Sequence, residues 1–173
     1  TSPMMEEVKY YAGELLRLSE YRQSVLEKMI TLAQPLPEYE ILLSIPGIAE
    51  TTGTSVIGEL GDIRRFTSAN QINAFIGIDL KHYESGDFLG QEHITKRGNP
   101  CARRILYKSI RNIASASHTN PCHIADFYEK RNRQSTIAST KPHTISSIHR
   151  LIRTMYYLIT HNKLYDYSLT QNR

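Results

Sequence analysis

The sequence is poor in cysteine, in long apolar runs and, over its second half, in acidic residues. The two cysteines, Cys101 and Cys122, are too few for a disulfide framework, so we expect a reducing, cytoplasmic setting. No apolar run approaches the roughly 18 residues of a membrane-spanning helix, so we expect neither a secretory leader nor a membrane partner. The chain begins with Thr1 rather than methionine, which indicates a fragment of a longer protein.

The acids that are present lie almost entirely in the first half of the chain. Residues 1–92 contain 7 Lys/Arg and 14 Asp/Glu, whereas residues 93–173 contain 14 Lys/Arg and 3 Asp/Glu. Such a basic segment is often only a solvated face, but it is also typical of a surface that neutralises nucleic-acid phosphates. Between Glu92 and Asp126 there is no acid and there are six cations: Lys96, Arg97, Arg103, Arg104, Lys108 and Arg111.

A hydrophobic content of 40% in 173 residues is enough for a real core. The first segment, residues 4–32, reads as one long helix because its apolar residues alternate at spacings of three and four. They favour a coiled coil over residues 1–34 and a homo-oligomer, and the alternative is an amphipathic helix that packs on its own domain. Pro35 and Pro37 then indicate a linker over residues 35–39. The expected apolar seam, interrupted only by the polar Arg22, consists of Val8, Tyr11, Leu15, Leu18, Val25, Met29 and Leu32.

A tight turn, Ile45-Pro46-Gly47-Ile48, separates two apolar helical stretches within residues 42–61, and the second helix is expected over Glu50–Leu60. The pattern resembles the helix-hairpin-helix motif, in which Gly47 would let the backbone come close to a DNA phosphate. Ala49 replaces the second glycine of that motif. A plain turn between two helices is the alternative.

The remaining sequence predicts short helices and one extended region. Extended residues 78–94 are expected to form a small β-hairpin with Ser85-Gly86-Asp87 at its corner. Asn99 is expected to cap a helix that has Pro100 at its first position. The predicted fold is therefore mainly α: a long coiled-coil-like helix, then a helical domain with a helix-hairpin-helix motif and one β-hairpin. Further helices are expected from Ser68 to about Phe75 with Gly77 closing it, over residues 122–131, and from Pro142 to about His161.

The side chains considered alone offer no metal site and only a weak nucleophile. Cysteines and histidines at 101, 118, 122 and 123 lack the paired spacing of a zinc site. The acids near the hairpin (79, 84, 87 and 92) are more typical of a soluble hairpin than of a metal site. Ser85 lacks the glycine frame of a nucleophile elbow, and although a basic helix start could polarise a phosphodiester for attack by its hydroxyl, these residues favour a simple turn.

Several motifs in fixed order change this interpretation. They are SIPGI (residues 44–48), IGELGDIRRFTSANQINAFIGI (57–78), ESG (84–86) and ITKRGNPCARRILY (94–107). Together they resemble the C-terminal transposase domain of the bridge-RNA-guided insertion-sequence transposases, the insertion-sequence "one-ten" family. The resemblance is strong over residues 40–117 and weaker beyond, and it assigns residues 40–173 to that domain.

The resemblance implies that Ser85 is a nucleophile, which forms a covalent phosphoserine intermediate with DNA during strand exchange. It matches Gly98, Asn99 and Arg103 to a family motif, with Ala102 in place of the usual leucine. It also implies an RNase H-like N-terminal domain, absent from this chain, whose four acids hold Mg²⁺ in the full-length protein. DNA and a guide (bridge) RNA are the expected partners, and the chain alone is expected to bind nucleic acid without cleaving it.

The nucleic-acid-binding residues expected from the basic segment and the turn are Gly47, Lys96, Arg97, Asn99, Arg103, Arg104, Lys108 and Arg111. The alternative function is a non-catalytic helix-hairpin-helix module that binds DNA or RNA and serves assembly.

Overall fold

The computed structural model describes residues 2–81, 84–85, 88–89, 93–136 and 138–170, and between residues 81 and 93 it describes only backbone. The described chain is mainly helical, as predicted. None of its helices is both long and apolar enough to span a bilayer. Its α-helices are α1 (Pro3–Ala33), α2 (Pro37–Leu43), α3 (Glu50–Leu60), α4 (Ala69–Ile76), α5 (Pro100–Ala116), α6 (His123–Arg133) and α7 (Lys141–Thr160), with 3₁₀ turns η1 (Ile63–Arg65) and η2 (Ser168–Thr170).

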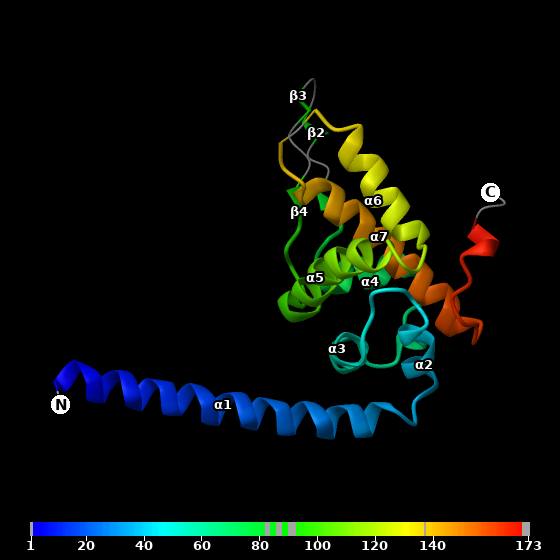
Figure 1. The fold of residues 1–173 in the computed structure, drawn as a ribbon. Coiled ribbons are helices and arrows are strands. Elements are labelled where there is room, and N and C mark those ends of the chain that lie inside the picture. Colours follow the sequence, from blue (N-terminus) through cyan, green and yellow to red (C-terminus); the bar gives the residue numbers. More distant parts are fainter. Residues whose placement is uncertain (1, 82–83, 86–87, 90–92, 137, 171–173) are drawn as a thin grey trace.

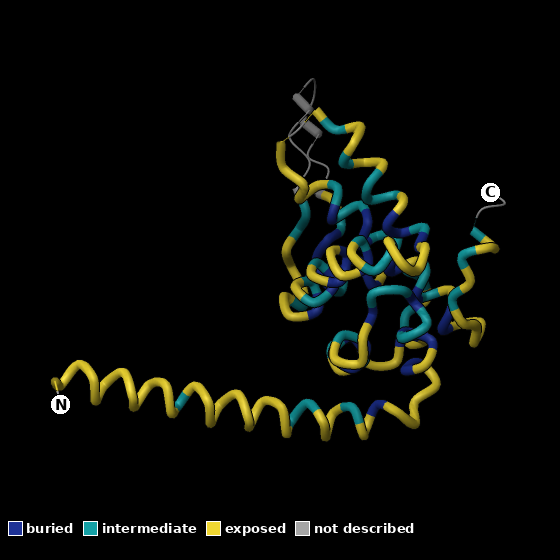
Figure 2. Tube along the Cα trace, in the orientation of Figure 1, coloured by how far each residue is buried: buried dark blue, intermediate teal, exposed yellow. Residues whose placement is uncertain are grey.

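Helix α7 holds the helical body together. It packs against α2, α4, α5, α6 and η1, and its inward face is buried (Figures 1 and 2). The spacing of three and four predicts one inward side made of Ile145, Ile148, Ile152, Met155 and Ile159. The last four are fully buried, and Ile145 is only partly buried. Burial of each such side chain contributes roughly 1.5–3 kcal/mol, so this stripe is a main source of the body's stability.

Helix α5 crosses the same core with two different faces. The sequence predicts an apolar face of Ala102, Ile105, Leu106, Ile110 and Ile113. This face packs against α3, α6 and α7, where Ile105 is only partly buried and the other four are buried. The residues on the other side of α5 are polar or charged and exposed. The buried face therefore fixes which side of α5 is presented to solvent.

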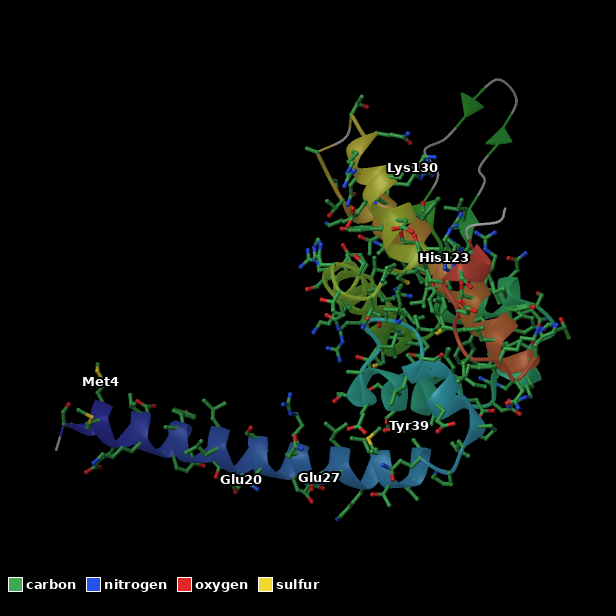
Figure 3. All side chains as sticks on the ribbon, turned by 45° about the vertical axis from the view of Figure 1, so that its right-hand side comes forward. Met4, Glu20, Glu27, Tyr39, His123 and Lys130 are labelled. Atoms are coloured by element: carbon green, nitrogen blue, oxygen red, sulfur yellow. The ribbon has the colours of Figure 1, made fainter. Side chains whose placement is uncertain are left out.

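Helix α1 extends away from the body instead of packing along it (Figures 1 and 2). Only Ala33 is buried in the whole helix, and α3 is the element that its C-terminal part contacts. The predicted seam is exposed except at Val25, which is half-buried, and Leu15 and Leu18 are 69% and 51% accessible. Figure 3 shows Met4 and Glu20 on the part that projects away from the body. The long helix is confirmed, whereas a coiled coil stays a prediction.

The linker between α1 and α2 is shorter than the sequence predicts. Residues 37–39, expected in the linker, form the first turn of α2, because Pro37 occupies the first helical position, where a missing N–H costs nothing. Helix α2 ends at Leu43, and α3 begins and ends where expected. The two helices are joined by a short turn, and its role as a helix-hairpin-helix motif stays a prediction.

The extended region contains four strands of two residues each. β1 (Leu80–Lys81) pairs with β4 (His93–Ile94), and β2 (Glu84–Ser85) pairs with β3 (Phe88–Leu89), both antiparallel. Ser85 lies opposite Phe88 in the second ladder. Gly86 and Asp87, which complete the expected hairpin corner, lie outside the described residues.

Candidate nucleic-acid interface

Asn99 caps the N-terminus of α5, as its position before Pro100 predicts. Its Oδ1 accepts hydrogen bonds from the backbone N–H groups of Cys101 at 2.9 Å and Ala102 at 3.1 Å. Its Nδ2 donates to Oε2 of Glu59 on α3, at 2.7 Å. Both ends of the Asn99 amide thus bind within the protein, and they fix where α5 begins relative to α3.

The loop before α5, residues 95–99, is fastened to the end of α4. Backbone N–H groups of Lys96 and Asn99 donate to the carbonyl oxygens of Gly77 and Phe75, each at 2.9 Å. A Cβ at Gly98 would lie 2.3 Å from the Phe75 carbonyl oxygen, and the residue has φ +133°, so only glycine fits this contact. The loop is therefore held in one place, and the cations on it are presented from a fixed backbone.

Five of the six cations between Glu92 and Asp126 are exposed: Lys96, Arg97, Arg104, Lys108 and Arg111. Within the described residues, none of the five forms an ion pair with a carboxylate. Arg104, Lys108 and Arg111 share one face of α5, opposite its buried stripe. An exposed row of uncompensated positive charge is the arrangement that binds a phosphate backbone.

Arg103, the sixth cation, is used differently. It is half-buried, and its Nη1 donates to the carbonyl oxygen of Ile76 at 2.7 Å. That carbonyl lies in the last turn of α4, where unpaired carbonyl oxygens attract positive charge. Arg103 therefore joins α5 to α4 through one of its N–H groups, a contact that its place in a basic run does not reveal.

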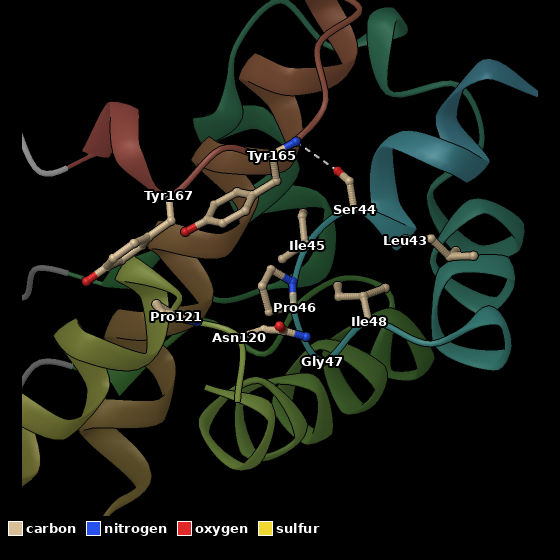
Figure 4. Close-up of a pocket in the computed structure, with 10 residues that line it drawn as sticks. All are labelled: Leu43, Ser44, Ile45, Pro46, Gly47, Ile48, Asn120, Pro121, Tyr165 and Tyr167. Carbon is tan, nitrogen blue, oxygen red and sulfur yellow. Dashed lines mark hydrogen bonds between the residues drawn. The ribbon is translucent and has the colours of Figure 1, made fainter. Parts of the chain in front are cut away.

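The turn around Gly47 packs on α5. A Cβ at Gly47 would lie 2.5 Å from the Cα of Ile113, and Gly47 has φ +84°, so close packing alone explains the glycine. The turn also borders a pocket of about 410 Å³, which Tyr165 and Tyr167 complete from the C-terminal segment (Figure 4). The assignment of Gly47 to a phosphate contact stays a prediction.

Ser85 lies apart from the start of α5. Its strand, β2, belongs to an arm in which the β1–β4 ladder is followed by the β2–β3 ladder, and β4 lies between β2 and α5 (Figure 1). The arm also projects from the body in the second view (Figure 3). β2 and the start of α5 thus lie in different parts of the described chain (Figure 1). The Ser85 side chain lies outside the described residues, so a site shared with Asn99, Arg103 and Arg104 stays a prediction.

No group of three or more His, Cys, Asp or Glu side chains among the described residues is placed to hold a metal ion. Asp79, the described acid nearest the arm in sequence, accepts a hydrogen bond from the Thr95 hydroxyl at 2.5 Å. The side chains of Glu84, Asp87 and Glu92 lie outside the described residues. His123 is occupied as well, because its ring nitrogens contact the Tyr165 and Thr154 hydroxyls at 2.8 and 3.2 Å.

The sequence did not predict Glu59 as the hydrogen-bond partner of Asn99. Glu59 orients the Asn99 amide from 40 positions earlier in the chain. A hydrogen bond between residues so far apart leaves no periodic or local signal. The motif order contained both residues, since each belongs to a segment on which the resemblance rests, but it did not pair them.

Comparison with known proteins places these residues in a family context. A family model described as "Transposase IS116/IS110/IS902 family" matches residues 39–129. The transposase for insertion sequence element IS1111A of Coxiella burnetii is 33% identical over 100 residues, which cover 58% of this chain and 28% of that protein. The transposase for insertion sequence element IS1328 of Yersinia enterocolitica is 28% identical over 119 residues, covering 64% and 36%.

A probable family 20 transposase of Pseudomonas aeruginosa is 26% identical over 109 residues, covering 58% of this chain and 32% of that protein. The chain thus matches about a third of the length of these curated relatives. The family match contains Ser85, the 95–99 loop and all of α5. Because it covers more than half of the sequence, the chain belongs to the IS116/IS110/IS902 family of transposases.

Proposed function

We propose that this chain is the C-terminal catalytic portion of a DNA transposase, in which Ser85 attacks a DNA phosphodiester and forms a covalent phosphoserine link. The observation that carries the proposal is the family match over residues 39–129, which includes both Ser85 and the basic surface of α5. The exposed, uncompensated cations of that surface support the choice of nucleic acid as partner. The serine itself rests on the resemblance of its motif.

The proposed step balances without an energy-rich cofactor. A bond forms between Ser85 Oγ and phosphorus, and one ester bond between phosphorus and a deoxyribose oxygen breaks. The serine hydroxyl loses its proton to a base, and the leaving deoxyribose oxygen takes up a proton. One phosphoester bond replaces another, so attack by a second DNA hydroxyl can rejoin strands and free the serine.

The basic residues have a positioning role in this proposal. Lys96, Arg97, Arg104, Lys108 and Arg111 hold the DNA backbone or the guide RNA through charge, independent of base sequence. The arm that carries Ser85 is separate from α5, so the bound strand has to extend from α5 to the arm. Alternatively, the two parts of one site come from different copies of the chain, which self-association through α1 would allow.

The Mg²⁺ that the resemblance implies does not fit the described part of this chain. A hydroxyl is a poor nucleophile without a base or a metal, and a metal would supply that activation. The described residues offer no cluster of ligands for it, so no step here depends on one. We propose that the metal-binding acids belong to a separate RNase H-like domain, and that this chain alone binds nucleic acid without cleaving it.

A second function has its own support. The α2–α3 turn, with its tyrosine-lined pocket, would suit a non-catalytic helix-hairpin-helix module that binds DNA or RNA. In that case the exposed apolar seam of α1 would serve assembly and Ser85 would be an ordinary turn residue.

Replacing Ser85 with alanine in the full-length protein distinguishes the two functions. If Ser85 is the nucleophile, recombination by Ser85→Ala falls to background, while its dissociation constant for DNA stays within about twofold of the wild-type value. The matched control is Ser115→Ala, an exposed serine on α5, which should recombine like the wild type. Undiminished recombination by Ser85→Ala would refute the catalytic proposal. If that variant also keeps its affinity for DNA, the non-catalytic helix-hairpin-helix module is favoured.

A further inference from the structure

Two consecutive arginines of η1, Arg64 and Arg65, have opposite environments. Arg64 forms ion pairs with Glu38 of α2 and with Asp62, and it also donates to the carbonyl oxygen of Ile159 on α7. Its charge is therefore compensated, and it serves to fasten η1 to two helices. Arg65 has no carboxylate partner among the described residues, and it is exposed.

The Arg65 guanidinium is nevertheless held in a fixed position. Its Cζ lies 4.5 Å from the ring centroid of Phe66 and 5.0 Å from that of Phe75, and the two rings pack edge-to-face with centroids 5.5 Å apart. Its Nη2 donates to the carbonyl oxygen of Leu60 at 3.0 Å. The cation is thus stacked on two aromatic rings and tied by one N–H, while its other N–H groups have no acceptor among the described residues.

Phe75 connects this cation to the basic loop. Its ring lies beneath Arg65, and its carbonyl oxygen accepts the hydrogen bond from the N–H of Asn99, at 2.9 Å. The same residue of α4 therefore positions Arg65 and anchors the start of α5. Because both contacts run through one short helix, Arg65 is fixed relative to the 95–99 loop.

We propose that Arg65 is a preformed contact for a nucleic-acid phosphate, which extends the binding surface from α5 across α4 to η1. The inference rests on the proposed function, because it assumes that α5 binds a phosphate backbone. A guanidinium whose rotamers are restricted by stacking loses little entropy when it binds a phosphate, and its planar fork matches the phosphate oxygens. Arg64, equally basic in sequence, is not available for this role.

Two substitutions separate the charge of Arg65 from its packing. Arg65→Gln removes the charge and keeps an amide that can donate to the Leu60 carbonyl oxygen, whereas Arg65→Lys keeps the charge and loses the flat stacking surface. The affinity of the 173-residue chain for a 20-base-pair DNA duplex, and for an RNA duplex of equal length, is measured across a salt series. Lys108→Ala is the comparator on α5, and Arg17→Ala on α1 controls for the loss of one positive charge. Thermal unfolding confirms that each variant is folded.

For Arg65→Gln we expect the slope of log affinity against log salt to decrease in magnitude by about one, as for Lys108→Ala, because one phosphate contact is lost. Arg65→Lys and Arg17→Ala should keep the wild-type slope. A loss with both duplexes supports a contact to any phosphate backbone, and a loss with only one identifies which backbone Arg65 meets. If the slope is reduced in Lys108→Ala but unchanged in Arg65→Gln, the inference about Arg65 is overturned and the proposed function is not. A wild-type chain that binds neither duplex overturns the proposed function and this inference together.

Discussion

At Asn99 a single side chain serves two elements. Its oxygen caps α5 and its nitrogen binds Glu59 of α3, so the start of the basic helix is set by the body of the protein. The second N–H of the Asn99 amide has no acceptor among the described residues, so the expected contact of Asn99 with nucleic acid stays a prediction. Asn99 positions the start of α5, and the exposed cations beside it carry the charge.

Asn99→Ala should lower the free energy of unfolding by about 1–2 kcal/mol, because the helix loses its cap and Glu59 loses its partner. Urea denaturation would measure the change. Asn112→Ala is the matched control, because Asn112 is exposed in the same helix and alanine has the higher helix propensity. Equal stability of the two variants would contradict the capping role.

His123 provides a second test at the residue scale. Burial and the nearby Arg150 charge lower its pKa from 6.5 to about 4. The unfolded chain takes up this proton near pH 6.5 and the folded chain only near pH 4, so the free energy of unfolding falls as the pH drops through that range. We expect this fall to be smaller in His123→Gln, as urea denaturation at several pH values would show.

The carboxylates titrate in the same range, so the comparison is between profiles of wild type and variant. His118→Gln, at an exposed position with no hydrogen bond of its side chain in the described structure, controls for the loss of a histidine. If the His123→Gln profile runs parallel to that of the wild type, His123 is not responsible for the pH dependence.

At the scale of the element, α5 divides its two tasks between two faces. The buried face packs on three helices, and the opposite face carries Arg104, Lys108 and Arg111. Substitutions on the exposed face should therefore change binding without changing the fold.

Lys108→Ala and Arg111→Ala should each weaken binding to unrelated DNA sequences by the same factor, since a phosphate contact carries no base information. Fluorescence anisotropy with duplexes of two different sequences would measure this. Ser115→Ala on the same helix should bind like the wild type. A loss confined to one of the two sequences would mean that these residues contact bases instead.

Helix α1 gives a different prediction at this scale, because its apolar residues lie exposed in the single chain. We expect self-association through this seam, to which each leucine buried in the assembly would contribute roughly 1.5–3 kcal/mol. Leu15→Asp together with Leu18→Asp should dissociate the assembly, whereas Gln23→Asp with Ser24→Asp, away from the seam, should not. Sedimentation analysis would decide, and a wild-type chain that is monomeric at tens of micromolar would contradict it.

Features within one helical turn could be predicted from the sequence. Asn99-Pro100 fixed the start of α5, and Gly77 marked the end of α4, where it takes the left-handed conformation. Contacts between distant segments could not be predicted. The hydrogen bonds from Asn99 to Glu59, 40 residues apart, and from Arg103 to Ile76 depend on how the helices pack. The expected neighbourhood of Ser85 and α5 stays a prediction, because the Ser85 side chain lies outside the described residues and closeness in sequence does not determine contact.

At the scale of the whole molecule, the chain consists of a compact helical body with two projections. Helix α1 extends from one side of the body, and the arm with Ser85 extends from another (Figure 1). The basic surface lies on the body itself, on α5 and the loop before it. In the proposed function, the body would bind the nucleic acid and the arm would carry the serine that exchanges strands.

The covalent step is the central claim of this account, and trapping it is the most direct test. The full-length protein is incubated with a nicked DNA substrate that prevents rejoining, and the DNA-linked peptide is identified by mass spectrometry. We predict a phosphodiester-linked adduct on Ser85, absent from Ser85→Ala and unaffected by Ser115→Ala. An adduct on another residue, or recombination without any adduct, would contradict the serine mechanism.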